Sequence, residues 1–379
     1  MKILLLDQIA RVNYKYSFSL ANALKDAGND IELVLDDIEE TGYCRCRFTQ
    51  KFLTARKDIG KLRKVINYLK AYQFIVKKAK NERFSIVHLQ WFQLSPMDYF
   101  YLKKLHKAGI KLVVSIHDIL PFNRKIYDMH FHKKIYGLCD ELIVQATANI
   151  GRFKELFPED AEKSEFIPHG HFLDFADVQD KAEARKKLSV PEDKTVLLFF
   201  GQIKRVKGLD ILLEAYGRLR ERRQGLFLIV AGSVWKDDFH IYREIIDKYS
   251  FSEDELKLDI RYIPEEETAG YFSASDAAVL PYTDIYQSGV LQMVYAYGLP
   301  AITSDRQFFK DFIEDGVNGY LSRTGDAESL AAAIVKAKEN KEAFPTMGER
   351  GREKIRELYS WEDIANKVTK VYEKVTARA

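Results

Sequence analysis

The sequence predicts an α/β protein made of two doubly wound parallel sheets, one in each half of the chain. The chain has 379 residues, which is too long for one ordinary core and suits two domains. Its hydrophobic content of 46% is sufficient for two cores. Both halves alternate short apolar runs with segments of helical periodicity, and this alternation is typical of parallel sheets buried on both faces.

The first half contains five candidate strands with helices between them. The expected helices include Ser17–Ala27, Val65–Lys80 and Tyr99–Ala108. Gly28 and Gly109 follow two of these helices, where a left-handed cap favours glycine. The candidate strands are Ile3–Leu6, Ile31–Leu35, Ile86–Leu89, Leu112–Ile116 and Leu142–Gln145.

The second half repeats the pattern from Val196 onward. Before it, the polar stretch Phe172–Pro191 is expected to be an interdomain linker, and Trp361–Thr376 is expected to be a helix that packs on either domain. We therefore expect domains at 1–175 and 176–358, and a C-terminal helix at 359–379 that can return to the first domain. The candidate strands are Val196–Phe200, Leu226–Ala231, Ile260–Ile263, Ala277–Pro281, Pro300–Thr303 and Gly319–Leu321.

Two such sheets bind ligands at the carboxyl ends of their strands, so the sequence predicts a ligand in a crevice where the halves face each other. The first residues, Met1–Asp7, have too short an apolar run for a signal peptide and predict a buried strand. No apolar run approaches the roughly 18 residues that span a bilayer. We therefore expect a cytoplasmic protein whose three cysteines are reduced thiols, with no zinc site.

The charge of the chain is unevenly distributed. Residues 45–83 contain 13 Lys and Arg but only two acids, although the whole chain carries only +3. Apolar residues from Leu62 to Ile75 recur among these cations at helical spacing. Such a run is either a solvated helix face or a basic amphipathic helix that binds an anionic membrane or a lipid-diphosphate acceptor. Nothing else in the sequence resembles a nucleic-acid-binding module.

The segment Leu198–Asp210 carries the clearest chemical signal. It reads LFFGQIKRVKGLD, in which a strand ends at Gly201, three cations follow and a helix begins near Leu209. Backbone N–H groups at a helix N-terminus bind phosphate well together with Lys or Arg. We expect Lys204 and Lys207 to hold a diphosphate, with Arg205 as a further cation. The alternative is an exposed basic turn. The motifs of NAD-binding and P-loop proteins are absent.

This segment resembles the phosphate-binding turn of glycosyltransferase family 4, whose members are retaining enzymes that use nucleotide-diphosphate sugars. Further stretches resemble the family in the same order, and together they cover most of residues 195–325. They are YFSASDAAVLPY at 271–282, SGVL at 288–291 with AYGLPAI at 296–302, and EDGVNGYL at 314–321. The resemblance implies the GT-B fold of two Rossmann-like domains that face a central cleft.

The chain departs from the family around the sugar-binding loop. Family members place two glutamates eight positions apart there, whereas alignment on Gly298 puts Ile285 and Met293 at those positions. The chain looks like a subgroup with a Gln-Ser-Gly-Val loop, here Gln287, Ser288, Gly289 and Val290. We expect amides of this loop to bind the β-phosphate or sugar hydroxyls. Gln292 either binds the ribose or is an exposed helical glutamine.

In the first half, His117 and Asp118 follow a candidate strand. Alone, the histidine reads as a surface residue, but the resemblance implies a contact with the donor sugar, and Asp118 becomes an acceptor candidate. The predicted turn 11–17 adds the acceptor candidates Asn13, Tyr14 and Lys15. His169 either lines the cleft or belongs to the hinge, and no carboxylate at ligand spacing suggests a metal.

The resemblance implies a retaining glycosyltransferase that needs no metal and uses the nucleotide-diphosphate sugar as co-substrate. The catalytic candidates are Lys204, Lys207 and His117. The donor-binding candidates are Gly201, Arg205, Gln292 and the loop 287–290. The acceptor is a glycan or a lipid-linked molecule, and the enzyme is expected in the cytoplasm or on the inner membrane surface. Because the two glutamates are missing, a non-catalytic nucleotide-sugar- or glycan-binding protein remains an alternative. A third is an epimerase or phosphorylase of the same architecture.

Overall fold

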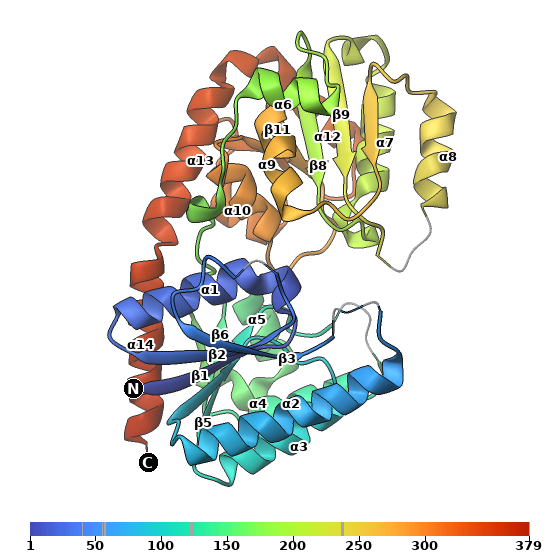
Figure 1. The fold of residues 1–379 in the computed structure, drawn as a ribbon. Coiled ribbons are helices and arrows are strands. Elements are labelled where there is room, and N and C mark those ends of the chain that lie inside the picture. The colour runs from blue at the N-terminus through green and yellow to red at the C-terminus, as the bar shows by residue number, and fades with distance from the viewer. Residues whose placement is uncertain (40, 55, 57, 122–124, 236–238, 379) are drawn as a thin grey trace. The chain divides into compact units, whose positions relative to one another are not determined.

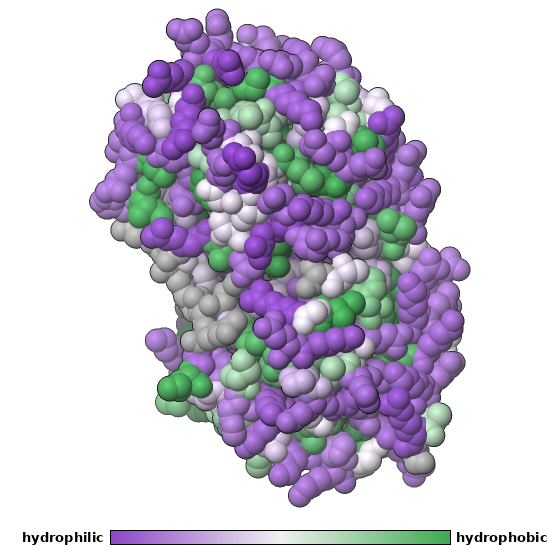
Figure 2. All heavy atoms as spheres, turned by 180° about the vertical axis from the view of Figure 1, so that it is seen from behind, coloured by the Kyte–Doolittle hydropathy of each residue, from purple (hydrophilic) through white to green (hydrophobic). Residues whose placement is uncertain are grey.

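The structure of the chain, a computed structural model, describes residues 1–39, 41–54, 56, 58–121, 125–235 and 239–378. These residues form two compact units. Unit 1 comprises Met1–Gly170 with Tyr359–Ala379, and unit 2 comprises His171–Leu358. Each unit is a parallel sheet with helices on its faces (Figure 1). The face of the molecule seen in Figure 2 is mostly hydrophilic, with hydrophobic residues in small scattered groups.

Unit 1 is built on a sheet of seven strands in its described residues, in the order β3-β2-β1-β4-β5-β6-β7. Every pairing is parallel. The strands are β1 (Lys2–Asp7), β2 (Asp30–Asp36), β3 (Arg47–Phe52), β4 (Ile86–Leu89), β5 (Lys111–Ile116), β6 (Glu141–Val144) and β7 (Ser164–Phe166). The helices are α1 (Ala10–Asp26), α2 (Lys61–Asn81), α3 (Ser95–His106), α4 (Asp128–Leu138), α5 (Thr147–Leu156), the short η1 (Pro158–Lys163) and α14 (Trp361–Ala377).

The C-terminal helix α14 is anchored in unit 1 by buried polar contacts. The hydroxyl of Tyr372 lies 2.6 Å from Nδ1 of His88, and Lys374 Nζ lies 2.7 Å from the carboxylate of Glu141. Trp361 packs so closely on Gly170 that a Cβ at this glycine would lie 2.4 Å from its indole ring. The last helix therefore completes the core of the unit that begins the chain, as its position beside α1 in Figure 1 illustrates.

Unit 2 is built on a sheet of six strands in its described residues, in the order β10-β9-β8-β11-β12-β13, again all parallel. The strands are β8 (Thr195–Phe200), β9 (Leu226–Ala231), β10 (Leu256–Asp259), β11 (Ala277–Leu280), β12 (Ala301–Ser304) and β13 (Gly319–Ser322). The helices are α6 (Lys181–Leu188), α7 (Leu209–Arg218), α8 (His240–Tyr249), α9 (Glu265–Ala274), α10 (Gly289–Ala296), α11 (Gln307–Phe312), α12 (Ala327–Glu339) and α13 (Phe344–Leu358), with short turns η2 (Leu173–Phe175), η3 (Arg205–Lys207), η4 (Arg220–Arg223) and η5 (Lys341–Ala343).

The prediction of two doubly wound parallel sheets is confirmed. Its errors lie where strands or helices lack a continuous apolar run. The edge strand β3 is mostly exposed and was not predicted, and neither was the three-residue β7. The strand expected at Ile260–Ile263 is wrong, because β10 ends at Asp259 and has one buried residue, Leu256, followed by three part-exposed residues.

Two segments expected to be irregular are helical. The expected turn 11–17 is wrong, because α1 begins at Ala10 and buries Tyr14 and Tyr16. The expected linker 172–191 contains α6, which is capped by Asp180. Arg185 on this helix is 6% exposed and its guanidinium lies 2.7 Å from the carboxylate of Asp276. Helix α6 thus belongs to unit 2. Its many charged residues made the segment resemble a linker, although a buried ion pair holds it as a helix.

Candidate functional site

The turn after β8 is fixed by close backbone contacts. Gly201 has φ of +102°, and its N–H donates to Ala231 O at the end of β9. A Cβ at Gly232, which follows β9, would lie 1.9 Å from Gly201 O. A Cβ at Gly208 would lie 2.3 Å from Pro281 O, just beyond β11. Three neighbouring strand ends therefore meet so closely that only glycine fits at these positions.

Lys207 points its ammonium group into this meeting point. Its Nζ donates to the hydroxyl of Tyr282 at 3.2 Å and lies 4.9 Å from the centre of that ring. A Cβ at Gly201 would lie 3.7 Å from Lys207 Nζ and 3.3 Å from the side chain of Val290. Gly201, Lys207 and Val290 are thus neighbours in space, although Gly201 and Val290 are 89 positions apart in the sequence.

The ammonium group of Lys207 has no anionic partner. Burial lowers its pKa from 10.5 to about 8, and no charged neighbour contributes to the shift. No carboxylate in the described part of the chain lies within ion-pair distance of Lys207. A partly buried cation without a counter-ion is favourable only if something else compensates for its lost hydration. This is the electrostatic character of a site for an anion.

Helix α10 adds hydrogen-bond donors to the same place. Ser288 caps it by accepting a hydrogen bond from Leu291 N at 3.1 Å, and the hydroxyl of Tyr282 also bonds to Ser288. Within the described contacts, the N–H groups of Gly289 and Val290 have no protein acceptor. The positive end of the α10 dipole and these two amides therefore lie beside the ammonium group of Lys207.

The other cations of the turn lie differently. Lys204 places its ammonium group 5.1 Å from the ring centre of Trp235, in the loop after β9, and its carbonyl accepts a hydrogen bond from Lys207 N. The side chain of Arg205 is exposed. Of the three cations expected to hold a diphosphate, the structure brings Lys207 to Gly201 and α10, and it places Lys204 toward the end of β9.

The loop before α10 is largely buried. Gln287 is partly buried, and Gln292 is 2% exposed with its Oε1 atom lacking a hydrogen-bond partner in the described contacts. The reading of Gln292 as an exposed helical residue is therefore wrong. Ile285 and Met293 are also buried, at 9% and 6% exposed.

Unit 1 has its own polar cluster at the carboxyl ends of its central strands. His117 follows β5 and is 1% exposed, so its reading as a surface residue is wrong. Its Nε2 lies 3.0 Å from Gln90 Oε1, and its ring stacks on Trp91 at 4.8 Å between centres. Burial, with help from His169, holds the pKa of His117 well below its usual value. His117 is therefore a neutral imidazole that donates through Nε2.

The acceptor candidates of unit 1 lie on the first turns of α1 and beside β5. Asn13 donates to the carboxylate of Asp7 at 3.3 Å, and Tyr14 is 5% exposed. Lys15 and Asp118 are partly exposed. Asp7 also accepts a hydrogen bond from Ser17 at 2.5 Å, and burial raises its pKa to about 6.

Sequence reasoning missed several residues that the structure brings to these two places. Gly232 directly follows β9 and Gln90 directly follows β4, while Tyr282 and Trp91 are the second residues after β11 and β4. The same rule that singled out His117, a polar or aromatic residue just beyond a buried parallel strand, would have found them. The contact of Asp7 with Asn13 had no such signal, because it depends on α1 starting at Ala10.

Comparison with known proteins identifies the fold and the family. A family model described as "Glycosyl transferases group 1" matches residues 180–354, and one described as "Glycosyltransferase Family 4" matches residues 15–175. The chain belongs to glycosyltransferase family 4. The expectation of a glycosyltransferase is confirmed at this level.

Relatives in sequence are distant. The chain is 26% identical over 260 residues to a D-inositol 3-phosphate glycosyltransferase of Nocardioides, and the match covers 65% of this chain and 56% of that protein. It is 22% identical over 300 residues to the lipopolysaccharide 1,2-N-acetylglucosaminetransferase of Salmonella typhimurium, covering 73% and 78%. Over the first of these relatives, the match thus spans little more than half of the relative's length.

Solved structures of the same fold match the entire chain. Sucrose-phosphate synthase from Thermosynechococcus elongatus superimposes with a TM-score of 0.79 at 20% identity, covering 100% of both chains. Anabaena Alr3699/HepE in complex with UDP gives 0.74 at 16% identity, covering 99% and 100%. At these identities the likeness establishes the GT-B fold alone, and it confirms the predicted fold class.

Proposed function

We propose that this member of the family transfers a sugar, with retention of its anomeric configuration, from a nucleotide-diphosphate sugar to a glycan or lipid-linked acceptor. The observation that carries the proposal is the unneutralised ammonium group of Lys207 beside Gly201 and the N-terminus of α10. The Anabaena neighbour is solved with UDP and with UDP-glucose, and the Salmonella relative is a lipopolysaccharide sugar transferase. These names support a nucleotide-sugar donor for this chain.

In the proposed reaction, Lys207 stabilises the diphosphate as it leaves the anomeric carbon. Negative charge grows on the β-phosphate while the glycosidic bond breaks, so a fixed cation there stabilises the transition state more than the ground state. The amides of Gly289 and Val290 would add two donors to the same phosphate. Lys204 and Arg205 would supply further positive charge, and Gln287, Ser288 and Gln292 would contact the sugar or ribose.

The sugar and acceptor would meet residues of unit 1. His117 is neutral and fixed by Gln90, so it suits a hydrogen bond to a sugar hydroxyl rather than a charge interaction. Asp118, Tyr14 and Lys15 are proposed acceptor contacts. Asn13 is a weaker candidate, because one of its hydrogen bonds is already made to Asp7. With retention by front-side attack, the leaving phosphate helps to deprotonate the acceptor.

We propose that no divalent metal takes part, because Lys207 and the helix dipole would already stabilise the leaving group. The test is transfer or donor hydrolysis measured with and without EDTA. Equal rates support the proposal. A loss of activity with EDTA that Mg²⁺ or Mn²⁺ restores would refute it.

The test of the donor site is a thermal-shift screen over UDP, GDP, ADP, CDP and dTDP. A ligand at 100 times its Kd adds about 2.7 kcal/mol of stability. We expect one of these nucleotides to stabilise the wild type and Lys207→Ala to lose the shift. Lys187→Ala, an exposed lysine on α6, is the matched control and should keep it. An unchanged shift in Lys207→Ala would refute the phosphate assignment.

A non-catalytic nucleotide-sugar-binding protein is the second candidate, and one observation favours it. The positions of the two family glutamates are taken by Ile285 and Met293, both buried and unable to accept a hydrogen bond from a hydroxyl. Donor hydrolysis separates the two functions. Tight binding of a nucleotide sugar without hydrolysis or transfer would favour the binding protein.

We further propose that the acceptor is lipid-linked and that the basic segment 45–83 brings the enzyme to the cytoplasmic surface of an anionic membrane. The cations of this segment and its exposed apolar residues support the proposal. No helix of the described residues is long and apolar enough to cross a bilayer. Any attachment through this segment would therefore be at the surface.

A further inference from the structure

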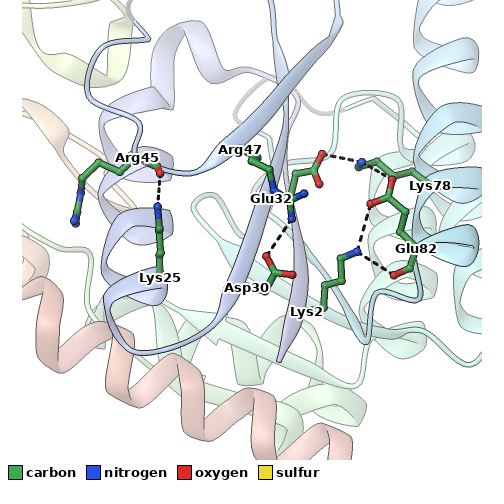
Figure 3. A network of polar contacts seen from close by, with 8 residues as sticks. All are labelled: Lys2, Lys25, Asp30, Glu32, Arg45, Arg47, Lys78 and Glu82. Atoms are coloured by element: carbon green, nitrogen blue, oxygen red, sulfur yellow. Dashed lines mark hydrogen bonds and ion pairs between the residues drawn. The ribbon is translucent and has the colours of Figure 1, made fainter.

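Many cations of the basic segment 45–83 are neutralised within unit 1. Arg47 lies 3.2 Å from Asp30, and Lys78 lies 2.8 Å from Glu32 and 2.7 Å from Glu82 (Figure 3). Arg45 pairs with Asp26, and Arg56 pairs with Asp58 and Asp37. Residues 55 and 57 lie outside the described part of the chain. These ion pairs lie around β2 and β3, so this part of the segment presents little net charge.

Helix α2, which carries Lys78, also carries five cations that are different. Lys61, Arg63, Lys70, Lys77 and Lys80 are exposed, and none of them forms an ion pair within the described residues, although Arg63 is near enough to Asp58 to help lower the pKa of that carboxyl. Helix α2 contains no acidic residue at all. Its positive charge therefore faces solvent.

Exposed apolar side chains lie among these cations. Leu62 is 74% exposed and Ile66 is 44% exposed, whereas Tyr68, Tyr72 and Ile75 pack into unit 1. Residues four apart share a helix face, so Leu62 and Ile66 continue into Lys70 along one outward stripe. The sequence placed Leu62 and Ile66 on the same apolar face as Tyr72 and Ile75. The structure separates them, because Leu62 and Ile66 remain exposed whereas Tyr72 and Ile75 are fully buried.

The neighbouring helices extend the same character. Helix α3 packs on α2 and α4 packs on α3. Phe100 on α3 is 53% exposed beneath Lys104, whose Nζ lies 4.2 Å from its ring centre. Beside α4, Ile126 is fully exposed and Met129 is 39% exposed. Of the twelve large exposed hydrophobic residues in the described chain, five therefore lie on or next to these three helices.

The acids of these helices do not reach the surface. Asp98 on α3 is 0% exposed and accepts hydrogen bonds from Tyr68 and Tyr72, and Asp128 on α4 is 5% exposed. On α3 and α4, the exposed Lys103, Lys104, Lys133 and Lys134 add to the cations of α2. Of these, Lys133 pairs with Glu159. We call the exposed residues of α2, α3 and 125–134 the basic face.

We propose that the basic face docks on the surface of an anionic lipid bilayer, with its cations at the headgroups and Leu62, Ile66, Phe100, Ile126 and Met129 at the boundary with the acyl chains. This deepens the membrane association proposed above and rests on it. Each cation near such a surface strengthens binding about fivefold, and each apolar side chain that becomes fully buried strengthens it about tenfold or more. A nucleic acid would use the cations, but aliphatic tips such as Leu62 gain nothing from a phosphate backbone.

The test is flotation of the full chain with vesicles of phosphatidylcholine alone or mixed with phosphatidylglycerol. We expect binding to the anionic vesicles only, weakened by salt. K61Q/R63Q/K70Q should lower the affinity about 100-fold, since three cations contribute about 3 kcal/mol. L62S/I66S should lower it at least tenfold without changing the salt dependence. All five residues are exposed or solvent-facing, so the substitutions do not threaten folding.

The matched control is K186Q/K187Q/R350Q, which removes three exposed cations from unit 2 and should bind as the wild type does. Failure of the wild type to bind anionic vesicles at low salt would overturn the proposal, as would an equal loss in the control. Binding to single-stranded RNA that depends on the three cations but not on Leu62 and Ile66 would also overturn it. The nucleotide thermal shift is measured on every variant. Because the basic face is remote in sequence from Lys207, the variants of the basic face should keep the thermal shift with nucleotide. A wild type that shows no thermal shift with any nucleotide would be a failure of the proposed donor site alone.

Discussion

Replacement of Lys207 by methionine should make the unliganded protein more stable and the liganded protein less so. Burial lowers the pKa of Lys207 from 10.5 to about 8. Since one pKa unit corresponds to about 1.36 kcal/mol, the buried ammonium group destabilises the free protein at neutral pH by about 3 kcal/mol. Methionine has a similar length and no charge, so it removes this penalty, and it also loses the hydrogen bond that Lys207 Nζ donates to the Tyr282 hydroxyl.

The same change removes the cation from the leaving diphosphate. We expect turnover to fall by about 10²–10³, the usual loss for one donor that stabilises developing charge. The assay is urea unfolding of the wild type and Lys207→Met, each with and without the nucleotide found by the screen. Lys186→Met, on the exposed side of α6, controls for the loss of a lysine as such. A Lys207→Met variant with unchanged unliganded stability and undiminished stabilisation by nucleotide would refute both roles of the Lys207 charge.

Three other predictions follow from the same contacts. Nucleotide affinity should be constant between pH 7 and about 8, and above pH 8 it should fall by up to about tenfold per pH unit, because the ligand binds the ammonium form of Lys207. Calorimetric titration of the wild type at several pH values checks this dependence. An affinity that does not change with pH would contradict the prediction. Gly232→Ala should destabilise unit 2 by about 3 kcal/mol or more, since the new Cβ would lie 1.9 Å from Gly201 O. The control is Gly298→Ala, where the Cβ would lie in open space at φ +70° and the substitution should cost only about 1 kcal/mol. Equal unfolding midpoints for the two variants would refute the close approach. Finally, burial lowers the pKa of His88 to about 3 and that of His169 to about 4. Below about pH 6.5 the unfolded chain therefore binds more protons at these two residues than the folded protein does, and the free energy of unfolding decreases as the pH falls. Asp7, with its pKa raised to about 6, and Asp98, whose pKa burial also raises, oppose this loss, whereas burial lowers the pKa of His117, His132 and His171 as well and adds to it. His88→Gln should therefore reduce the loss between pH 7.5 and 5 by about 2 kcal/mol in urea unfolding, and an undiminished loss would exclude His88 as its source.

The sequence was most informative where local chemistry and burial agree. The central strands β1, β4, β5, β8 and β9 are continuous apolar runs because both of their faces are covered, so their position was predictable to within a residue or two. The same is true of the glycine turn at Gly201 and of the start of α10 after Ser288, where the residue types themselves require the backbone that is found.

The sequence was least informative where a charged or polar side chain is buried by a distant partner. Helix α6 is rich in charge and was read as a linker, yet Arg185 is held by Asp276 across 91 positions. For Gln292 and His117 the sequence left open both an exposed position and a ligand contact, and both residues are buried. No local pattern reports such a partner, because it is supplied by another strand end or helix.

By itself, the sequence determined two doubly wound sheets, the family and a lysine-bearing turn after a buried strand, since these depend on periodicity and on residues adjacent in the chain. Only the tertiary structure decided which cations remain without a counter-ion. Among the residues that the structure describes, it left Lys207 and the exposed lysines of α2 without an ion pair, while Arg47 and Lys78 are paired with carboxylates of β2. The reason is physical: the charge of a side chain is fixed by its type, but its solvation and its neighbours are fixed by the fold, and these decide whether the charge is available to a ligand.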